Sequence, residues 1–143
     1  MKRAFKDYLI SIGILRPVQQ RVEAILGFYA SLGEQIEYIF VTDHVREDGT
    51  RAYGNLWLFS DRHVMEAKDF VARDTFDMSP IQPVHWWEVN KEKYDFSAAV
   101  PESRMSLDLS LQGDVRGHLS ASGNNCDRLK QIILKYILPN MSH

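Results

Sequence analysis

Residues 36–70 carry the pattern of three short antiparallel strands joined by two tight turns, and this pattern constrains the fold more than any other feature. The Asp48-Gly49 pair suits a two-residue type I′ turn, because both central positions of that turn require a positive φ. Asp61-Arg62 suits the centre of the second turn. Together the two turns predict these cross-strand pairs: Val45 with Ala52, Val41 with Leu56, Phe40 with Trp57, Ile39 with Leu58, Tyr38 with Phe59, Met65 with Leu58, and Ala67 with Leu56.

This register gives the sheet two apolar faces. The first, which we call the aliphatic face, contains Ile39, Val41, Leu56, Leu58, Met65 and Ala67. The second, the aromatic face, contains Tyr38, Phe40, Tyr53, Trp57, Phe59, Val64 and Phe70, interrupted by Thr42, Asn55, Glu66 and Lys68. An antiparallel sheet with one wet side alternates apolar with polar residues. Because this sheet does not, we expect something to cover each face.

Length and composition indicate one globular domain over residues 1–143. The formal net charge is −2 and the Lys and Arg residues are scattered singly, so we expect no binding to nucleic acid. The apolar stretch near the N-terminus is too short to span a bilayer, and we expect no membrane span. The single cysteine excludes an intramolecular disulfide and favours a cytoplasmic location.

Amphipathic helices are predicted at both ends of the chain. Residues 5–15 fit either a helix or a short strand, and we favour the helix. Residues 17–32 place Pro17 at the first helical position and carry an apolar stripe, while Gly27 inside them indicates close packing on that side. The last helix should use Asn125 as its N-cap and end at Pro139. The two apolar stripes are Val18, Val22, Ile25, Leu26 and Tyr29, and then Leu129, Ile132, Ile133, Tyr136 and Ile137.

More strands are predicted between the meander and the last helix. Residues 84–89 and 94–96 fit a hairpin, which would pair Trp87 with Phe96 and Glu88 with Asp95. Residues 105–111 alternate apolar with polar side chains, as a half-buried strand does. A loop near residues 113–117 would then place Leu119 opposite Leu111 and Ala121 opposite Leu109. Residues 71–83 fit a long loop with a short edge strand at 75–78, and loops of this length are often functional.

The predicted fold class is α+β, with an N-terminal helix or helices, about seven antiparallel strands in a strongly bent sheet or partly open barrel, and a C-terminal helix. Over residues 34–138 this element order resembles that of pleckstrin-homology-like barrels. The resemblance concerns element order only, and it implies a C-terminal helix that caps one open end of the barrel. The alternative is a helix-grip or other cavity-forming α+β fold, which needs residues 8–14 as its first strand.

Metal and cofactor chemistry have no signature in this sequence. His44 and His63 fall at opposite ends of the meander, and Cys126 has no second thiol, so we expect no metal and no cofactor. Cys126 stands at a predicted helix N-terminus, which can lower a thiol pKa, but a small buried residue is the more usual role. The acid pairs Asp74–Asp77 and Glu88–Asp95 are more typical of solubilising residues than of catalysis.

These patterns favour a non-enzymatic binding or protein-interaction domain that uses the aromatic face or the loop at residues 74–83. The candidate binding residues are Tyr38, Phe40, Trp57, Phe59, Glu66 and Trp86. A homodimer is the simplest partner hypothesis, followed by an unidentified protein or a small apolar ligand. The alternative is a small cavity-containing enzyme or carrier in which Glu66 is an acid with a raised pKa. A third possibility gives the face no binding role, because the helix at residues 17–32 could simply cover it.

Overall fold

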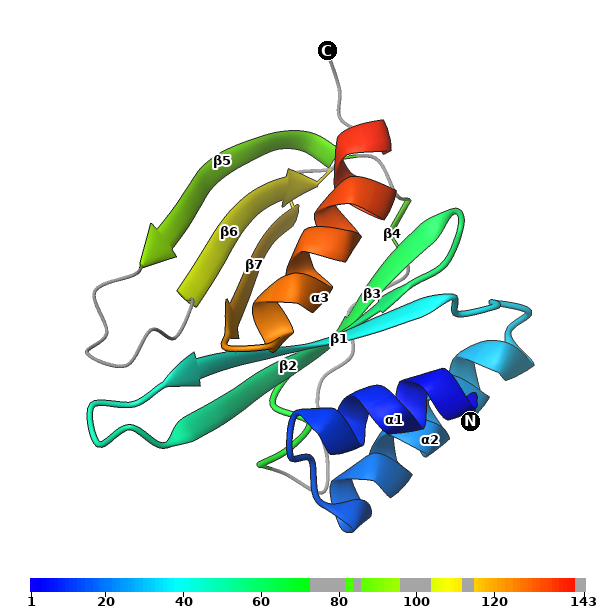
Figure 1. Cartoon of the computed structure of the whole chain (residues 1–143). Coiled ribbons are helices and arrows are strands. Elements are labelled where there is room, and N and C mark those ends of the chain that lie inside the picture. The colour runs from blue at the N-terminus through cyan, green and yellow to red at the C-terminus, as the bar shows by residue number, and fades with distance from the viewer. Residues whose placement is uncertain (73–81, 84–85, 96–103, 112–114, 141–143) are drawn as a thin grey trace.

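The computed structural model describes residues 1–72, 82–83, 86–95, 104–111 and 115–140, with backbone only for 82–83, 86–95 and 115. Helices stand at both ends of the chain and strands lie between them (Figure 1). The elements are α1 (Arg3–Ser11), α2 (Arg16–Ser31), β1 (Tyr38–Val45), β2 (Arg51–Phe59), β3 (His63–Ala67), β4 (Gln82–Pro83), β5 (Trp86–Asp95), β6 (Arg104–Leu111), β7 (Val115–Ser122) and α3 (Asn125–Ile132). A π-helical turn, Ile133–Ile137, and a 3₁₀ turn, Leu138–Asn140, extend α3.

The described strands form two separate antiparallel sheets. Sheet A has the order β1-β2-β3-β4, in which β4 is only two residues long, and sheet B has the order β5-β6-β7. The α+β class is therefore confirmed, but the single bent sheet or partly open barrel of about seven strands is wrong. The physical reason lies at the corner where β1 meets β7. There Ser122 N donates to the Asp43 side chain at 3.0 Å and not to a backbone carbonyl, and within the described residues no strand ladder joins the sheets.

The helices α1 and α2 cover the aliphatic face of sheet A. Their buried side chains, among them Leu9, Val22 and Ile25, pack with the predicted aliphatic residues of β1, β2 and β3 in one core. Tyr53 and Phe70 join this core, although the predicted register had assigned them to the aromatic face. The helix predicted at residues 17–32 is thus confirmed as α2, but it does not cover the aromatic face. The helix-grip alternative is wrong as well, because residues 3–11 form α1 and not a strand.

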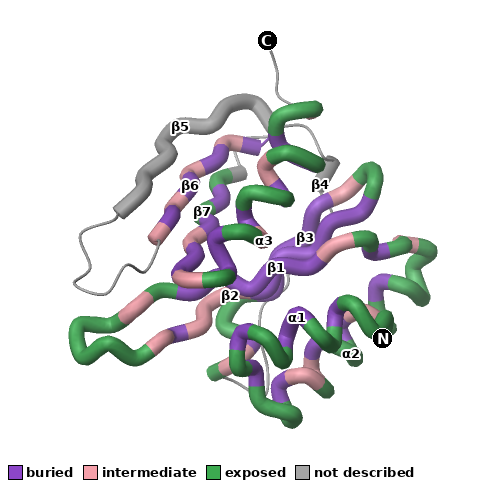
Figure 2. Tube along the Cα trace, in the orientation of Figure 1, coloured by how far each residue is buried: buried purple, intermediate pink, exposed green. Residues whose placement is uncertain are grey.

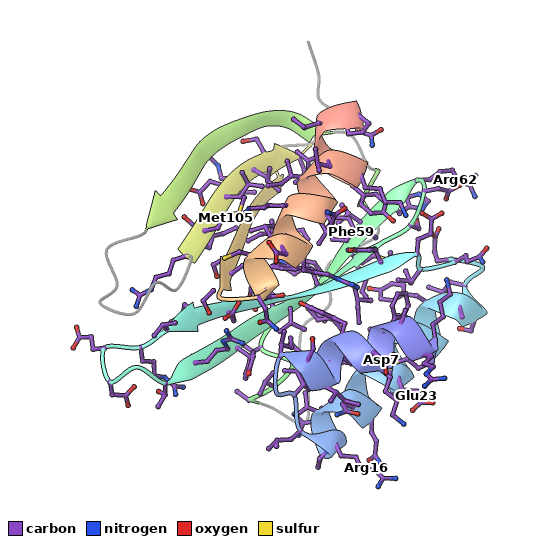
Figure 3. All side chains as sticks on the ribbon, viewed as in Figure 1. Asp7, Arg16, Glu23, Phe59, Arg62 and Met105 are labelled. Atoms are coloured by element: carbon purple, nitrogen blue, oxygen red, sulfur yellow. The ribbon has the colours of Figure 1, made fainter. Side chains whose placement is uncertain are left out.

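The apolar part of the aromatic face is covered by α3 and sheet B, which form a second core with it (Figure 2). Phe59 and Met105, both labelled in Figure 3, come from the two sheets and belong to this core. The ring of Tyr136, at the end of α3, stacks on Phe59 with centroids 5.0 Å apart. The predicted stripe of the last helix is confirmed, since Leu129, Ile132, Tyr136 and Ile137 are buried and Ile133 is partly buried.

The predicted register of the meander is confirmed where the strands are most apolar. Tyr38 pairs with Phe59, Phe40 with Trp57, Ile39 with Leu58, Val41 with Leu56, Met65 with Leu58 and Ala67 with Leu56. The first turn differs, because Arg46 N donates to Thr50 O at 2.8 Å and Asp48 has no positive φ. The loop therefore has three residues, with only Gly49 at a positive φ of 86°, and Val45 pairs with Arg51.

A β-bulge opposite Thr42 restores the register after this longer loop. Gly54 and Asn55 both face Thr42, and Asn55 N donates to Thr42 Oγ1 at 2.8 Å. A Cβ atom on Gly54 would lie 2.7 Å from the same Oγ1, which explains a glycine at this position. One extra residue in the loop and one in the bulge cancel, so the aromatic and aliphatic pairs remain as predicted.

Sheet B departs further from the sequence prediction. β5 is continuous, and Glu88 pairs with Ser110 while Asp95 pairs with Arg104, so the hairpin turn at residues 90–93 is wrong. Leu119 pairs with Leu107, and Ala121 with Met105, four residues from the predicted partners. The shift is an even number of residues, so the buried side chains stay on the predicted face. Phe96, the edge strand at 75–78 and residues 73–81 of the long loop lie outside the described residues.

Candidate functional site

A groove remains open between β7 and the polar end of the aromatic face, next to the part of the face that the second core buries. It has a volume of about 460 Å³. We call it the polar groove, and its lining residues are Thr42, His44, Asn55, Glu66 and Lys68 from sheet A and Arg116, His118 and Ser120 from β7. Except for Lys68, in the turn directly after β3, these residues lie on strands, which hold side chains more firmly than loops do.

The strand period of two explains why β7 presents polar side chains here. Arg116, His118 and Ser120 alternate with residues that face the second core. Between them, Gly117 brings the backbone of β7 against Trp57. A Cβ atom on Gly117 would lie 2.7 Å from Cη2 of the indole ring, so any other residue would push the strand away.

Glu66 is the one deeply buried acid in the lining of the polar groove, with an exposed fraction of 9%. Asn55 Nδ2 donates to Glu66 Oε2 at 3.0 Å, and Asn55 Oδ1 accepts from Asp69 N at 3.1 Å, so the amide is fixed on both sides. Burial raises the pKa of Glu66, while the Asn55 hydrogen bond and the charge of Lys68 oppose this shift. The carboxyl group is held in place and is costly to ionise.

His118 and Asp108 form a hydrogen-bonded pair at the rim of the groove. They are cross-strand neighbours on β7 and β6, and His118 Nδ1 hydrogen-bonds Asp108 Oδ1. Both side chains are substantially exposed. When the proton lies on Nδ1, the other ring nitrogen, Nε2, is the free acceptor. This arrangement can bind a ligand donor or accept a proton from one.

The six predicted binding residues lie in different parts of the structure. Phe40, Trp57 and Phe59 lie in the second core, with exposed fractions of 0%, 2% and 0%. Tyr38 is partly exposed, and the Arg128 guanidinium lies 3.8 Å from its ring centroid. Glu66 lines the polar groove. Trp86 begins β5, and its side chain lies outside the description.

The sequence interpretation did not bring Arg116, His118 and Ser120 to this site. Their alternation predicted an exposed strand face, but their meeting with Glu66 depends on how sheet B packs on sheet A. Gly117 was the one available signal, because a glycine inside a strand often marks a close approach of the backbone. His44 also lines the groove, whereas His63 lies at the other turn, where its Nδ1 is 2.7 Å from Glu34 Oε1.

Cys126 is not the reactive thiol that its place at a helix start would allow. Its side chain is 2% exposed, and burial raises its pKa to about 11, with the negative charge of Asp43 adding to the shift. Asn125 does not cap α3 either, since the N-cap position belongs to Asn124. The side chain of Asn125 is engaged with β1 instead.

The hydrogen bonds of the Asn125 side chain belong to a buried cluster of hydrogen bonds along the free edge of β1, which we call the β1 edge cluster. Tyr8 Oη accepts from Val41 N at 3.0 Å and donates to Asn125 Oδ1 at 2.7 Å. Asn125 Nδ2 donates to Val41 O and to Asp43 Oδ1, both at 2.8 Å. The nearly buried Asp43 also lies 3.1 Å from Arg51 Nε. The cluster ties α1, β1 and α3 together, and we regard it as structural.

Among the described residues, no group of three or more His, Cys, Asp and Glu side chains is placed to hold a metal ion. None of the helices in the described ranges combines the length and the apolar character needed to cross a membrane. No protein-family model, curated protein or solved structure matches this chain.

Proposed function

We propose that this chain is a non-enzymatic binding domain and that the polar groove is its ligand site. The observation that carries the proposal is Glu66, a nearly buried carboxyl group on the wall of an open groove of about 460 Å³. Small-molecule sites are typically concavities of this size with a few fixed polar groups. An acid that burial makes harder to ionise reduces stability unless something compensates, and such groups concentrate at functional sites.

The covered part of the aromatic face plays a supporting role in this proposal. Phe40, Trp57 and Phe59 are buried within one chain, so a second copy could reach them only if α3 and sheet B moved away. We therefore assign binding to the polar end of the face and give homodimerisation no part in it. Trp57 supports the groove by seating Gly117 of β7 beside Glu66's strand.

Two-dimensional amide NMR of the labelled protein with a library of small polar molecules tests the proposal. We expect binders to shift amides of β1, β2, β3 and β7 that line the groove. Glu66→Gln should weaken these binders by about tenfold or more, the scale of one lost hydrogen bond to a charged group.

Glu23→Gln is the matched control, because Glu23 is an exposed carboxylate on α2, on the other side of sheet A (Figure 3). This control should bind as the wild type does. Shifts confined to other surfaces, or equal affinities for wild type and Glu66→Gln, would refute the polar groove as the ligand site.

A second candidate is an enzyme that uses the same groove for acid–base chemistry, and the His118–Asp108 pair favours it. A carboxylate that orients a histidine leaves the other ring nitrogen as a general base, and Glu66 could supply an acid nearby. A screen with p-nitrophenyl esters and phosphates tests this. Any turnover should fall by about 100-fold or more in His118→Ala, the usual contribution of a general base. Turnover that survives this change would exclude His118 as the base.

A further inference from the structure

The charged groups of the polar groove are separated into one buried negative group and two exposed positive ones. Glu66 is nearly buried, whereas Lys68, in the turn directly after β3, and Arg116 on β7 are exposed. In the part of the chain that the structure describes, neither cationic side chain forms an ion pair or hydrogen bond, although the charge of Lys68 acts on Glu66. His118 is hydrogen-bonded to Asp108, which is not itself part of the groove lining.

Glu66 has one carboxyl oxygen left for a ligand. Asn55 Nδ2 donates to Oε2, and within the described residues Oε1 has no hydrogen-bond donor. A ligand ammonium at Oε1 would meet a carboxylate that is already oriented. A charge-assisted hydrogen bond there would offset the cost of burying the Glu66 carboxylate. Arg116 offers a guanidinium, which binds a carboxylate through two parallel hydrogen bonds, and Lys68 adds a second positive charge.

Ligands with a single charge suit this groove poorly. A simple anion would meet Arg116 and Lys68 but would be repelled by Glu66, while a simple amine would meet Glu66 but would be repelled by the two cations. A molecule that carries both charges satisfies all three residues. The volume of about 460 Å³ is in the range that suits small ligands.

Resting on the function proposed above, we infer that the ligand class of the polar groove is a small zwitterion of the amino-acid type. Its ammonium group binds Glu66, and its carboxylate binds Arg116 and Lys68. The side chain of such a ligand then lies along the other lining residues, which include Thr42 and His118.

The test uses amide NMR titrations with a panel of free amino acids and with matched analogues that lack one charged group. For norvaline these analogues are butylamine, without the carboxylate, and pentanoate, without the ammonium. We expect groove amides to respond to amino acids, and removal of either charge to weaken binding by about tenfold or more.

Two variants test which groove residues bind the ammonium group of the ligand and which bind its carboxylate. In Glu66→Gln, norvaline should bind no more tightly than pentanoate, because the partner of the ammonium group is gone. In the double variant Lys68→Gln with Arg116→Gln, norvaline should bind no more tightly than butylamine, because the partners of the carboxylate are gone. The double variant changes exposed side chains only, so its thermal melting should match the wild type. Arg46→Gln, on an exposed loop residue outside the groove lining, is the matched control and should leave all affinities unchanged.

The outcomes separate this inference from the function on which it rests. If a singly charged analogue binds in the groove as tightly as its amino acid, or if no amino acid moves the groove amides, the zwitterion inference is overturned. The binding function survives that result when other library molecules still move the same amides, and it fails with the inference when none do.

Discussion

The two faces of sheet A are buried in different ways. On the aliphatic face, two helices next to one another in sequence cover short aliphatic side chains, and every predicted member of that face is at most 1% exposed. On the aromatic face, α3 and sheet B cover one end only, where Phe40, Trp57 and Phe59 lie. At the other end Thr42, Asn55, Glu66 and Lys68 line the polar groove.

The difference indicates where this molecule can bind something. A fully apolar face is closed by its own chain and leaves no polar group in need of a partner. A face that changes from aromatic to polar along its strands cannot be closed throughout by an apolar cover, because each buried polar group would need a hydrogen bond. The groove lies where the aromatic residues stop, and Asn55 supplies Glu66 with its hydrogen bond there.

The largest expected effects come from truncating neighbouring residues of β2 that face opposite cores. Trp57→Ala should cost about 3–5 kcal/mol and Leu58→Ala about 2–5 kcal/mol of unfolding free energy, because each leaves a cavity in a closed core. Urea denaturation of both variants measures this. Phe28→Ala, at a half-exposed position on α2, is the control and should cost much less.

The two results together decide whether both faces are closed by the chain itself. A large loss for Leu58→Ala with a mild one for Trp57→Ala would mean that α3 and sheet B do not close the aromatic face. Trp57 would then again be a candidate for contact with a partner.

The next largest effect concerns the β1 edge cluster, which joins the layers on the two faces. Tyr8→Phe removes the hydroxyl group that accepts from Val41 N and donates to Asn125 Oδ1. Two buried groups lose a partner, so we expect a cost of about 1–3 kcal/mol. Hydrogen exchange at the Val41 amide should accelerate more than exchange at the Leu58 amide. Equal acceleration at both would show only a global loss of stability and would contradict a specific role for Tyr8 at this edge.

The sequence predicted the meander well because its signals are local. Alternation over residues 38–45 and 51–59 fixed which side chains share a face, and turn residues fixed where the strands reverse. The type of the first turn was wrong, since nothing in the pattern distinguished a two-residue turn from a three-residue loop followed by the Gly54 bulge. The aromatic pairs were nevertheless correct, because the two shifts cancel.

Which element covers which face could not be predicted in the same way. The stripe of α2 shows that the helix must bury Val22 and Ile25, but both faces of sheet A are apolar and either would accept it. The site shows the same limit. Glu66 was identified because an acid among aromatic residues is conspicuous, whereas Arg116 and His118 reach it only through the packing of sheet B on sheet A, which includes the contact of Gly117 with Trp57.

A smaller effect of opposite sign tests how tightly the helical layer packs. Gly27 was expected to mark a close approach, but a Cβ atom there would have no atom within 4 Å. Gly27→Ala should therefore stabilise the protein by about 0.5–1 kcal/mol, because alanine restricts the unfolded chain and favours the helix. Gly33→Ala should destabilise it, since Gly33 has a φ of 84°. Thermal melting measures both, and a destabilised Gly27→Ala would indicate closer packing around α2 than the structure has.

The smallest effect is the dependence on pH at the polar end of the aromatic face. Burial raises the pKa of Glu66 in the folded state, so the folded protein holds this proton more firmly than the unfolded chain does. The stability that the protonated carboxyl group contributes is complete below about pH 4, the ordinary range for glutamate, and is lost as the pH rises through the folded pKa.

Glu66→Gln can still accept the Asn55 hydrogen bond and does not ionise, so its stability relative to wild type should increase from pH 4 to pH 7. Denaturation curves at several pH values measure this difference, with Glu47→Gln, on the exposed loop between β1 and β2, as the control that should show no such trend. A constant difference across this range would mean that Glu66 ionises at no cost, and the polar groove would then lack the poised carboxyl group on which its proposed role depends.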